Sequence, residues 1–227
     1  MSWMRKNWAW ILVVIIAIVP LINIFSAISL NFTNRSFDFI LFDDYELPDH
    51  LAEQLGRDVI PGVKIAIHQT GEWAIRWMIA VLLISPFRIV FGTKNNLYVR
   101  QAMGISSGVY VTLHFFFFLY SEGILAVFSE FNLVFGLIAS LIILILMITS
   151  NRKSMKFLKK GWKKIHRFVF VAISLSILHV VLLEKGWALY AIVFVMGLIV
   201  RYKPIRYRLE TSRIRVPCKK LIQQKIR

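Results

Sequence analysis

The sequence has little cysteine and few acidic residues. Cys218 is the only cysteine among 227 residues, so one chain can build neither a disulfide framework nor a thiolate cluster, and a free thiol is expected. Asp and Glu number 12 against 28 Lys and Arg, and charged residues make up only 18% of the chain. These scarcities exclude disulfide-rich secreted domains and cysteine-based metal sites.

Apolar residues dominate instead, at 58% of the chain with a mean hydropathy of +0.66. A soluble domain of this size cannot bury so many apolar side chains, whereas spans of about 20 residues can face lipid directly. The composition therefore predicts an all-α, polytopic membrane bundle. The basic residues lie beside the apolar spans, where membrane lipid accounts for the net charge of +16, so we expect no nucleic-acid partner.

Six transmembrane helices are expected from the uncharged runs. Their ranges are about 8–30, 68–88, 100–120, 131–150, 162–179 and a sixth that ends near residue 200. The first run is far longer than a signal-peptide core, which predicts a retained helix. We expect residues 1–203 to form the transmembrane domain and residues 204–227 to form a basic cytoplasmic tail.

The distribution of basic residues predicts the orientation. With six spans, 23 of the 28 Lys and Arg lie on the side of both termini, which are therefore expected in the cytoplasm. Residues 31–67 carry seven of the twelve acids and become a periplasmic loop. This loop is either a solvated connector or a docking surface for a basic partner.

Three histidines lie in or beside the third and fifth spans. An ionisable side chain in a bilayer is costly unless it is paired, hydrated or ligated. The topology places His114 and His179 toward the outer face and His166 at the inner face. Because both spans run outward, His114 and His179 can face each other as the axial pair of a b-type haem. The alternative is that these histidines are structural or relay protons in a scaffold or transporter.

The rotation of the fifth span raises a difficulty. Thirteen residues separate His166 from His179, which corresponds to about 220° around a straight α-helix. One face of a straight helix would not present both rings. A kink, or ligation on different sides of the helix, is therefore required.

The third span offers a polar inner end. Arg100 and His114 lie about 40° apart around the helix and about 21 Å apart along it, and small residues separate them on that face. Gly104 and Ser107 leave room for a bulky group, and Gly104 with Gly108 forms a GxxxG pattern that is also typical of close helix packing. At the inner level, Arg100 and His166 predict a site for an anionic group, such as a haem propionate or a flavin phosphate, with lipid headgroup binding as the alternative.

The second span opens with ionisable residues. Glu72 and Arg76 are four residues apart and either neutralise each other or leave Arg76 to bind an acidic cofactor group. His68 is an interfacial histidine, a proton carrier or an auxiliary ligand.

The sequence resembles the ferric-reductase-like transmembrane superfamily and, within it, the haem-binding membrane subunits of bacterial protein-methionine-sulfoxide reductase systems. The resemblance covers about 136 residues, and its motifs are HQTGEWAIRW (68–77), LLISPFR (82–88), RQAMG…TLH (100–114), ITSNRKSM (148–155), KKGWKKIHRFVF (159–170) and SILH (176–179). It implies that His114, His166 and His179 are haem-associated, with Arg100 near an inner haem. Gln101 stands where the family pattern often has a second arginine. The family is also associated with flavin mononucleotide (FMN).

The resemblance implies a function in electron transfer at the bacterial inner membrane. We expect one or two b-type haems that receive electrons from a cytoplasmic flavoprotein or from quinol and pass them to a periplasmic reductase of methionine sulfoxide. Residues 201–227 hold no Gly-rich phosphate loop, so the chain is expected to be a subunit and not a complete enzyme. Reduction of ferric or cupric ions at the outer haem is the alternative function.

Overall fold

The computed structural model describes residues 2–26, 28–30, 40–48, 50, 56, 58–93, 97–183 and 186–212. Cys218, residues 213–227 of the predicted tail and part of the predicted acidic loop lie outside these ranges. The statements that follow concern the described residues.

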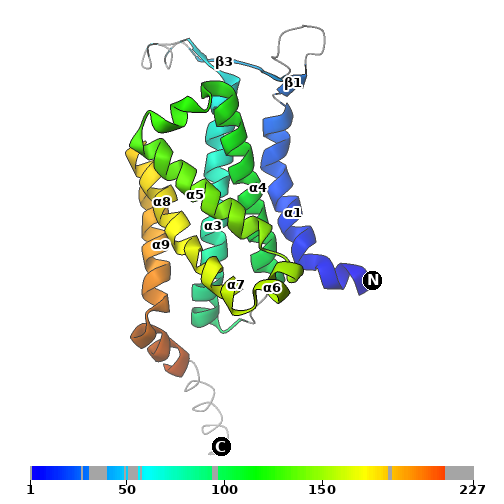
Figure 1. Ribbon diagram of the computed structural model, residues 1–227, viewed down its shortest axis with the longest axis vertical. Helices are drawn as coiled ribbons and strands as arrows, with labels where there is room; N and C mark the ends of the chain where they lie inside the picture. The colour runs from blue at the N-terminus through cyan, green and yellow to red at the C-terminus, as the bar shows by residue number, and fades with distance from the viewer. Residues whose placement is uncertain are drawn as a thin grey trace, which may run out of the picture.

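Long helices build the molecule and confirm the predicted all-α membrane bundle (Figure 1). In chain order, the main helices are α1 (Ser2–Ser26), α3 (Gly62–Phe91), α4 (Leu97–Glu122), α5 (Phe131–Ile148), α8 (Val169–Leu182) and α9 (Ala188–Arg201). Shorter helical segments are η1 (Leu125–Phe128), α6 (Arg152–Leu158), α7 (Lys160–Ile165) and η2 (His166–Phe168).

Two helix pairs form the centre of the bundle. Helix α3 packs mainly on α4, and α5 packs mainly on α8, while α4 also contacts α5. Helix α1 lies against α4, where the fully buried hydroxyl of Tyr110 donates a 2.6 Å hydrogen bond to the carbonyl of Ala17. Helix α9 lies against α3. The pairs α3–α4 and α5–α8 therefore determine which side chains meet in the interior.

The predicted fifth helix is broken. Helix α7 ends at Ile165, the 3-10 turn η2 begins at His166, and α8 starts at Val169. Each residue of a 3-10 turn advances about 120° instead of 100°, so the turn changes the relative direction of side chains before and after it. The turn thus changes the relative direction of His166 and His179, while residues 160–182 remain one candidate span.

The end of the bundle opposite α6 and α7 carries short strands (Figure 1). Strand β1 (Ile28–Leu30) pairs antiparallel with β2 (Ile40–Phe42), and β3 (Tyr45–Glu46) pairs with β4 (Val59–Ile60). The predicted end of the first helix at residue 30 is therefore wrong, because residues 28–30 find their hydrogen-bond partners in β2 instead of continuing the helix.

Helix α3 begins six residues earlier than the second span expected from the sequence. Its first residue is Gly62, whose amide donates to Oδ1 of Asp44 at 3.1 Å. A Cβ at this position would lie 2.3 Å from the carbonyl oxygen of Asp43, so only glycine fits. At its other end, α3 stops at Gly92, which adopts φ 72° and donates its amide to Arg88.

The lengths of the helices fit a membrane. Five helical segments are long and apolar enough to cross one, and a sixth is obtained if α9 and residues 203–212, which meet at a bend of 72°, form one span. Helix α9 alone has 14 residues and is about 21 Å long, shorter than a bilayer core of about 30 Å. Large apolar side chains are exposed on the outer faces, as at Ile15 (59%) and Leu189 (67%), where lipid would cover them. The cytoplasmic location of the termini stays a prediction.

Candidate functional site

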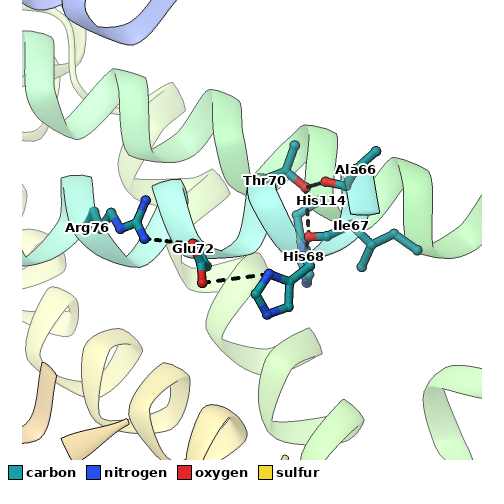
Figure 2. A network of polar contacts seen from close by, with 7 residues as sticks. All are labelled: Ala66, Ile67, His68, Thr70, Glu72, Arg76 and His114. Carbon is teal, nitrogen blue, oxygen red and sulfur yellow. Dashed lines mark hydrogen bonds and ion pairs between the residues drawn. The ribbon is translucent and has the colours of Figure 1, made fainter. Parts of the chain in front are cut away.

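His114 on α4 points at the backbone of α3. Its Nδ1 lies 2.8 Å from the carbonyl oxygen of Ile67 (Figure 2). Because a carbonyl only accepts, Nδ1 carries the hydrogen, and the neutral ring keeps its lone pair on Nε2. The ring lies directly against Gly71, where an added Cβ would be 3.0 Å from Nδ1 and Cε1.

His179 on α8 is held in the same way by α5. Its Nδ1 lies 2.7 Å from the carbonyl oxygen of Asn132, which again leaves Nε2 as the nitrogen with a lone pair. The ring lies against Gly136, where an added Cβ would be 3.1 Å from Nδ1. In each helix pair, therefore, Nδ1 of the histidine donates to a backbone carbonyl and the ring lies against a glycine.

Both histidines are oriented by a hydrogen bond from Nδ1 to a backbone carbonyl. A metal-ligating histidine almost always donates its second ring N–H to a carbonyl or carboxylate, which fixes the tautomer and directs the other nitrogen to the metal. Two neutral imidazoles of this kind suit haem iron, which accepts them as axial ligands. In the part of the chain that the structure describes, no group of three or more His, Cys, Asp or Glu could hold a metal ion.

The small residues of α4 divide between two roles. A Cβ at Gly104 would meet no atom within 4 Å, so this position borders open space as a cofactor would need. A Cβ at Gly108 would lie 2.8 Å from Cβ of Met147 on α5, so this glycine serves close helix packing. Ser107 is buried and donates to the carbonyl of Ala74 on α3, so packing also accounts for it.

The inner histidine has a different environment. Nε2 of His166 lies 3.2 Å from Oγ1 of Thr149, and its ring stacks on Trp162 with centroids 4.0 Å apart. Half-buried Arg100 acts electrostatically on His166. Gln101, next to Arg100, donates to the carbonyl of Ser150 at 2.6 Å and so joins α4 to the end of α5.

Arg201 at the end of α9 is a further cation that the sequence pattern does not single out. Its guanidinium donates to the carbonyl of Leu82 at 2.5 Å and lies 5.0 Å above the ring of Phe170. Arg201 also interacts electrostatically with Arg100. Its position after the last apolar run reads as an ordinary membrane-flanking charge, and only the packing of α9 on α3 brings it to the inner site.

Three ionisable residues of α3 form one network along the helix surface (Figure 2). Arg76 donates to Oε2 of Glu72 at 2.7 Å, and Nδ1 of His68 lies 3.6 Å from Oε1 of the same carboxylate. All three side chains are between 38% and 48% exposed. Glu72 and Arg76 therefore neutralise each other, which is one of the two alternatives predicted for them. His68 lies in the second turn of α3 and not at the helix entrance. His68 interacts electrostatically with His114, so these three residues of α3 lie beside the outer site.

Gly71 and Gly136 are not among the residues predicted from the sequence. The signal that would have identified them is a repeated spacing, because each glycine stands 43 residues before the histidine that it faces. That spacing indicates a contact between glycine and histidine only when it is known that α3 packs on α4 and α5 on α8.

Comparison with known proteins places the chain among redox membrane proteins. Residues 70–177 match the family described as the ferric reductase like transmembrane component, a range that includes His114 and His166 and ends just before His179. The protein-methionine-sulfoxide reductase heme-binding subunit MsrQ of Rhizobium meliloti (strain 1021) is 31% identical over 160 residues, which cover 66% of this chain and 74% of that protein. MsrQ of Brucella ovis is 28% identical over 148 residues, which cover 62% and 66% of the two chains. No solved structure shows significant similarity.

Proposed function

Because the chain belongs to the ferric-reductase-like transmembrane family and, within it, to the haem-binding subunits of protein-methionine-sulfoxide reductases, we propose that it binds b-type haem between His114 and His179 and transfers electrons across the membrane. Bound haem would supply a one-electron iron couple. The single observation that carries the proposal is the matched pair of hydrogen bonds, 2.8 Å and 2.7 Å long, that leave Nε2 of both histidines available.

The residues around this site control its chemistry. Donation of both Nδ1–H groups to carbonyls raises the basicity of the imidazoles and fixes their orientation. Haem held by both His114 and His179 would favour electron transfer over oxygen binding. A Cβ at Gly104 would meet no atom within 4 Å, which leaves room on α4 for a bulky group.

A second site at the inner end takes an anionic group of a second haem or of FMN. Arg100, Arg201 and His166 come from three different elements, and Arg100 acts electrostatically on each of the other two. Guanidinium groups bind propionates and phosphates through charge-assisted hydrogen bonds. At the outer end, Arg76 would bind an acidic cofactor group through the guanidinium nitrogens that do not bond Glu72, and His68 is an auxiliary residue there.

The donor and the acceptor lie on opposite sides of the membrane in this proposal. Residues 1–203 form one transmembrane unit in the bacterial inner membrane, and residues 204–227 are a basic cytoplasmic tail. The donor is a cytoplasmic flavoprotein or quinol, and an exposed basic groove suits an acidic protein or anionic lipid. The groove is lined by Lys159, Lys160, Lys163, Lys164 and Arg167. The acceptor is a periplasmic reductase that repairs methionine sulfoxide.

Optical spectra of the purified protein, oxidised and then reduced with dithionite, test the proposal. The wild type should show a low-spin b-type spectrum. His114→Ala and His179→Ala should lose it, whereas replacement of the exposed His50 should not. Full spectra in both variants, or a colourless wild type after expression with a haem precursor, would exclude the site and favour the scaffold or transporter alternative.

A second measurement separates the acceptors. The family name favours ferric or cupric ions as an alternative acceptor at the outer haem. The reduced protein should be reoxidised rapidly by a periplasmic methionine sulfoxide reductase and slowly by chelated ferric ions. The reverse order of rates would assign the chain to metal-ion reduction.

A further inference from the structure

The two outer histidines share a geometry that extends beyond their hydrogen bonds. The accepting carbonyl stands 47 residues before the histidine in both cases, Ile67 before His114 and Asn132 before His179. The glycine in contact with each ring stands four residues after that carbonyl, at position 71 or 136. The same backbone, glycine and histidine arrangement therefore occurs twice, once in each central helix pair.

Helix geometry explains why a glycine is needed there. The Cα–Cβ bond of a helical residue tilts toward the helix N-terminus, so the side chain at one position lies over the carbonyl of the preceding turn. A residue other than glycine at position 71 or 136 would cover the carbonyl that the imidazole must reach. The added Cβ would be 3.0 Å from the ring of His114 and 3.1 Å from that of His179, tighter than nearly all real Cβ contacts.

We propose that Gly71 and Gly136 are positioning residues for the two haem ligands. Each glycine lets an imidazole lie on the helix backbone, donate its Nδ1–H to the carbonyl and turn Nε2 toward the iron. This inference rests on the proposed function, because it assigns to the glycines a role in setting the affinity and the reduction potential of the same site.

Substitution by alanine should move the ring by a few tenths of an ångström and lengthen the Nδ1–carbonyl distance. Loss of such an outer-shell contact typically lowers metal affinity by about tenfold or more. A less basic imidazole stabilises ferric iron less, so the reduction potential should rise. If the tenfold loss falls on the ferric state alone, the rise is about 59 mV for a one-electron couple.

The chain offers two matched controls. A Cβ at Gly197 on α9 would make an ordinary 3.7 Å contact with Pro86, far from any histidine, so Gly197→Ala reports the effect of a helical glycine replacement alone. Gly108→Ala would meet the side chain of Met147 and reports packing strain without a histidine contact. Spectroelectrochemical titration should give a raised potential for Gly71→Ala and Gly136→Ala and the wild-type potential for both controls.

A haem-free readout tests the contact itself. In apoprotein, Gly71→Ala should lower the unfolding temperature, but in a His114→Ala background it should not, because the ring that it meets is gone. Recovery of folded double variant also supports the proposal if Gly71→Ala alone does not accumulate.

The outcomes are distinguishable. If the wild type binds no haem, the proposed function is excluded. The coupling between Gly71→Ala and His114→Ala in the unfolding temperature of the apoprotein is then a separate result. A haem-loaded wild type whose Gly71→Ala and Gly136→Ala variants match Gly197→Ala in potential, and show no coupling to the histidines, overturns the positioning role.

Discussion

Thr149 engages the inner histidine through the ring nitrogen that the outer pair leaves available. Its Oγ1 lies 2.7 Å from the carbonyl of Ile145 and 3.2 Å from Nε2 of His166. The hydroxyl has one hydrogen, which goes either to Ile145, so that Nε2 of His166 donates, or to Nε2 itself. In both cases Nε2 is the hydrogen-bonded nitrogen of His166, whereas in His114 and His179 it is Nδ1.

This contrast predicts that Thr149→Val strengthens ligand binding at the inner site. If His166 binds iron through Nε2, it must first give up the bond to Thr149, whose net contribution is about 0.5–1.5 kcal/mol. Removing the hydroxyl removes that competition. With RT near 0.59 kcal/mol, the affinity should rise by about 2-fold to 13-fold.

Haem titration in a His114→Ala background isolates the inner site, with binding followed by absorbance and stoichiometry by the pyridine haemochrome. The matched control is Thr112→Val, because the hydroxyl of Thr112 also bonds a carbonyl one turn earlier, that of Gly108 at 2.8 Å, without any histidine contact. Weaker binding in Thr149→Val than in Thr112→Val would refute the reasoning and make Thr149 part of the site. Equal binding would show that Nε2 of His166 is not the ligand.

Three further predictions concern stability and access. Tyr110→Phe removes the buried bond to Ala17 and should lower the free energy of unfolding in detergent by about 0.5–1.5 kcal/mol; an unchanged value would show that the bond adds nothing net. Glu72→Gln breaks the exposed pair with Arg76 and should change that free energy by less than about 1 kcal/mol, so a larger loss would mean that the pair is shielded. Gly104→Phe fills open space and should block haem loading, whereas Gly104→Ala should not; full loading of the Phe variant would show that no cofactor lies there.

Much of the fold follows from hydropathy because the bilayer imposes it. The uncharged runs predicted α5 from its first residue, Phe131, and located α3 and α4 to within a few residues at most ends. The errors lie where lipid exerts no control. Residues 28–30 are apolar enough to extend α1, yet they pair with β2, a contact that no local pattern reveals.

The sequence predicts the depth of the candidate site but not the direction of its side chains. Counting residues along two parallel spans predicts His114 and His179 at one level and Arg100 and His166 at the other. The hydrogen-bond acceptors could not be found in this way, because Ile67 and Asn132 contribute only backbone carbonyls. A carbonyl is common to all residues and leaves no mark in a sequence.

The same reason explains why no internal repeat is evident although the structure contains one arrangement twice. Each central helix pair must preserve a histidine, a glycine 43 residues before it and a carbonyl four residues before the glycine. The carbonyl belongs to an apolar residue in one pair and to an amide residue in the other, so only two positions in each pair are constrained in type. Two constrained positions are too few for a repeat to be recognised by residue identity, yet they suffice to present two Nε2 atoms in equivalent settings. In the proposed haem site, both ligands would use this shared backbone geometry, and the surrounding side chains differ between the pairs.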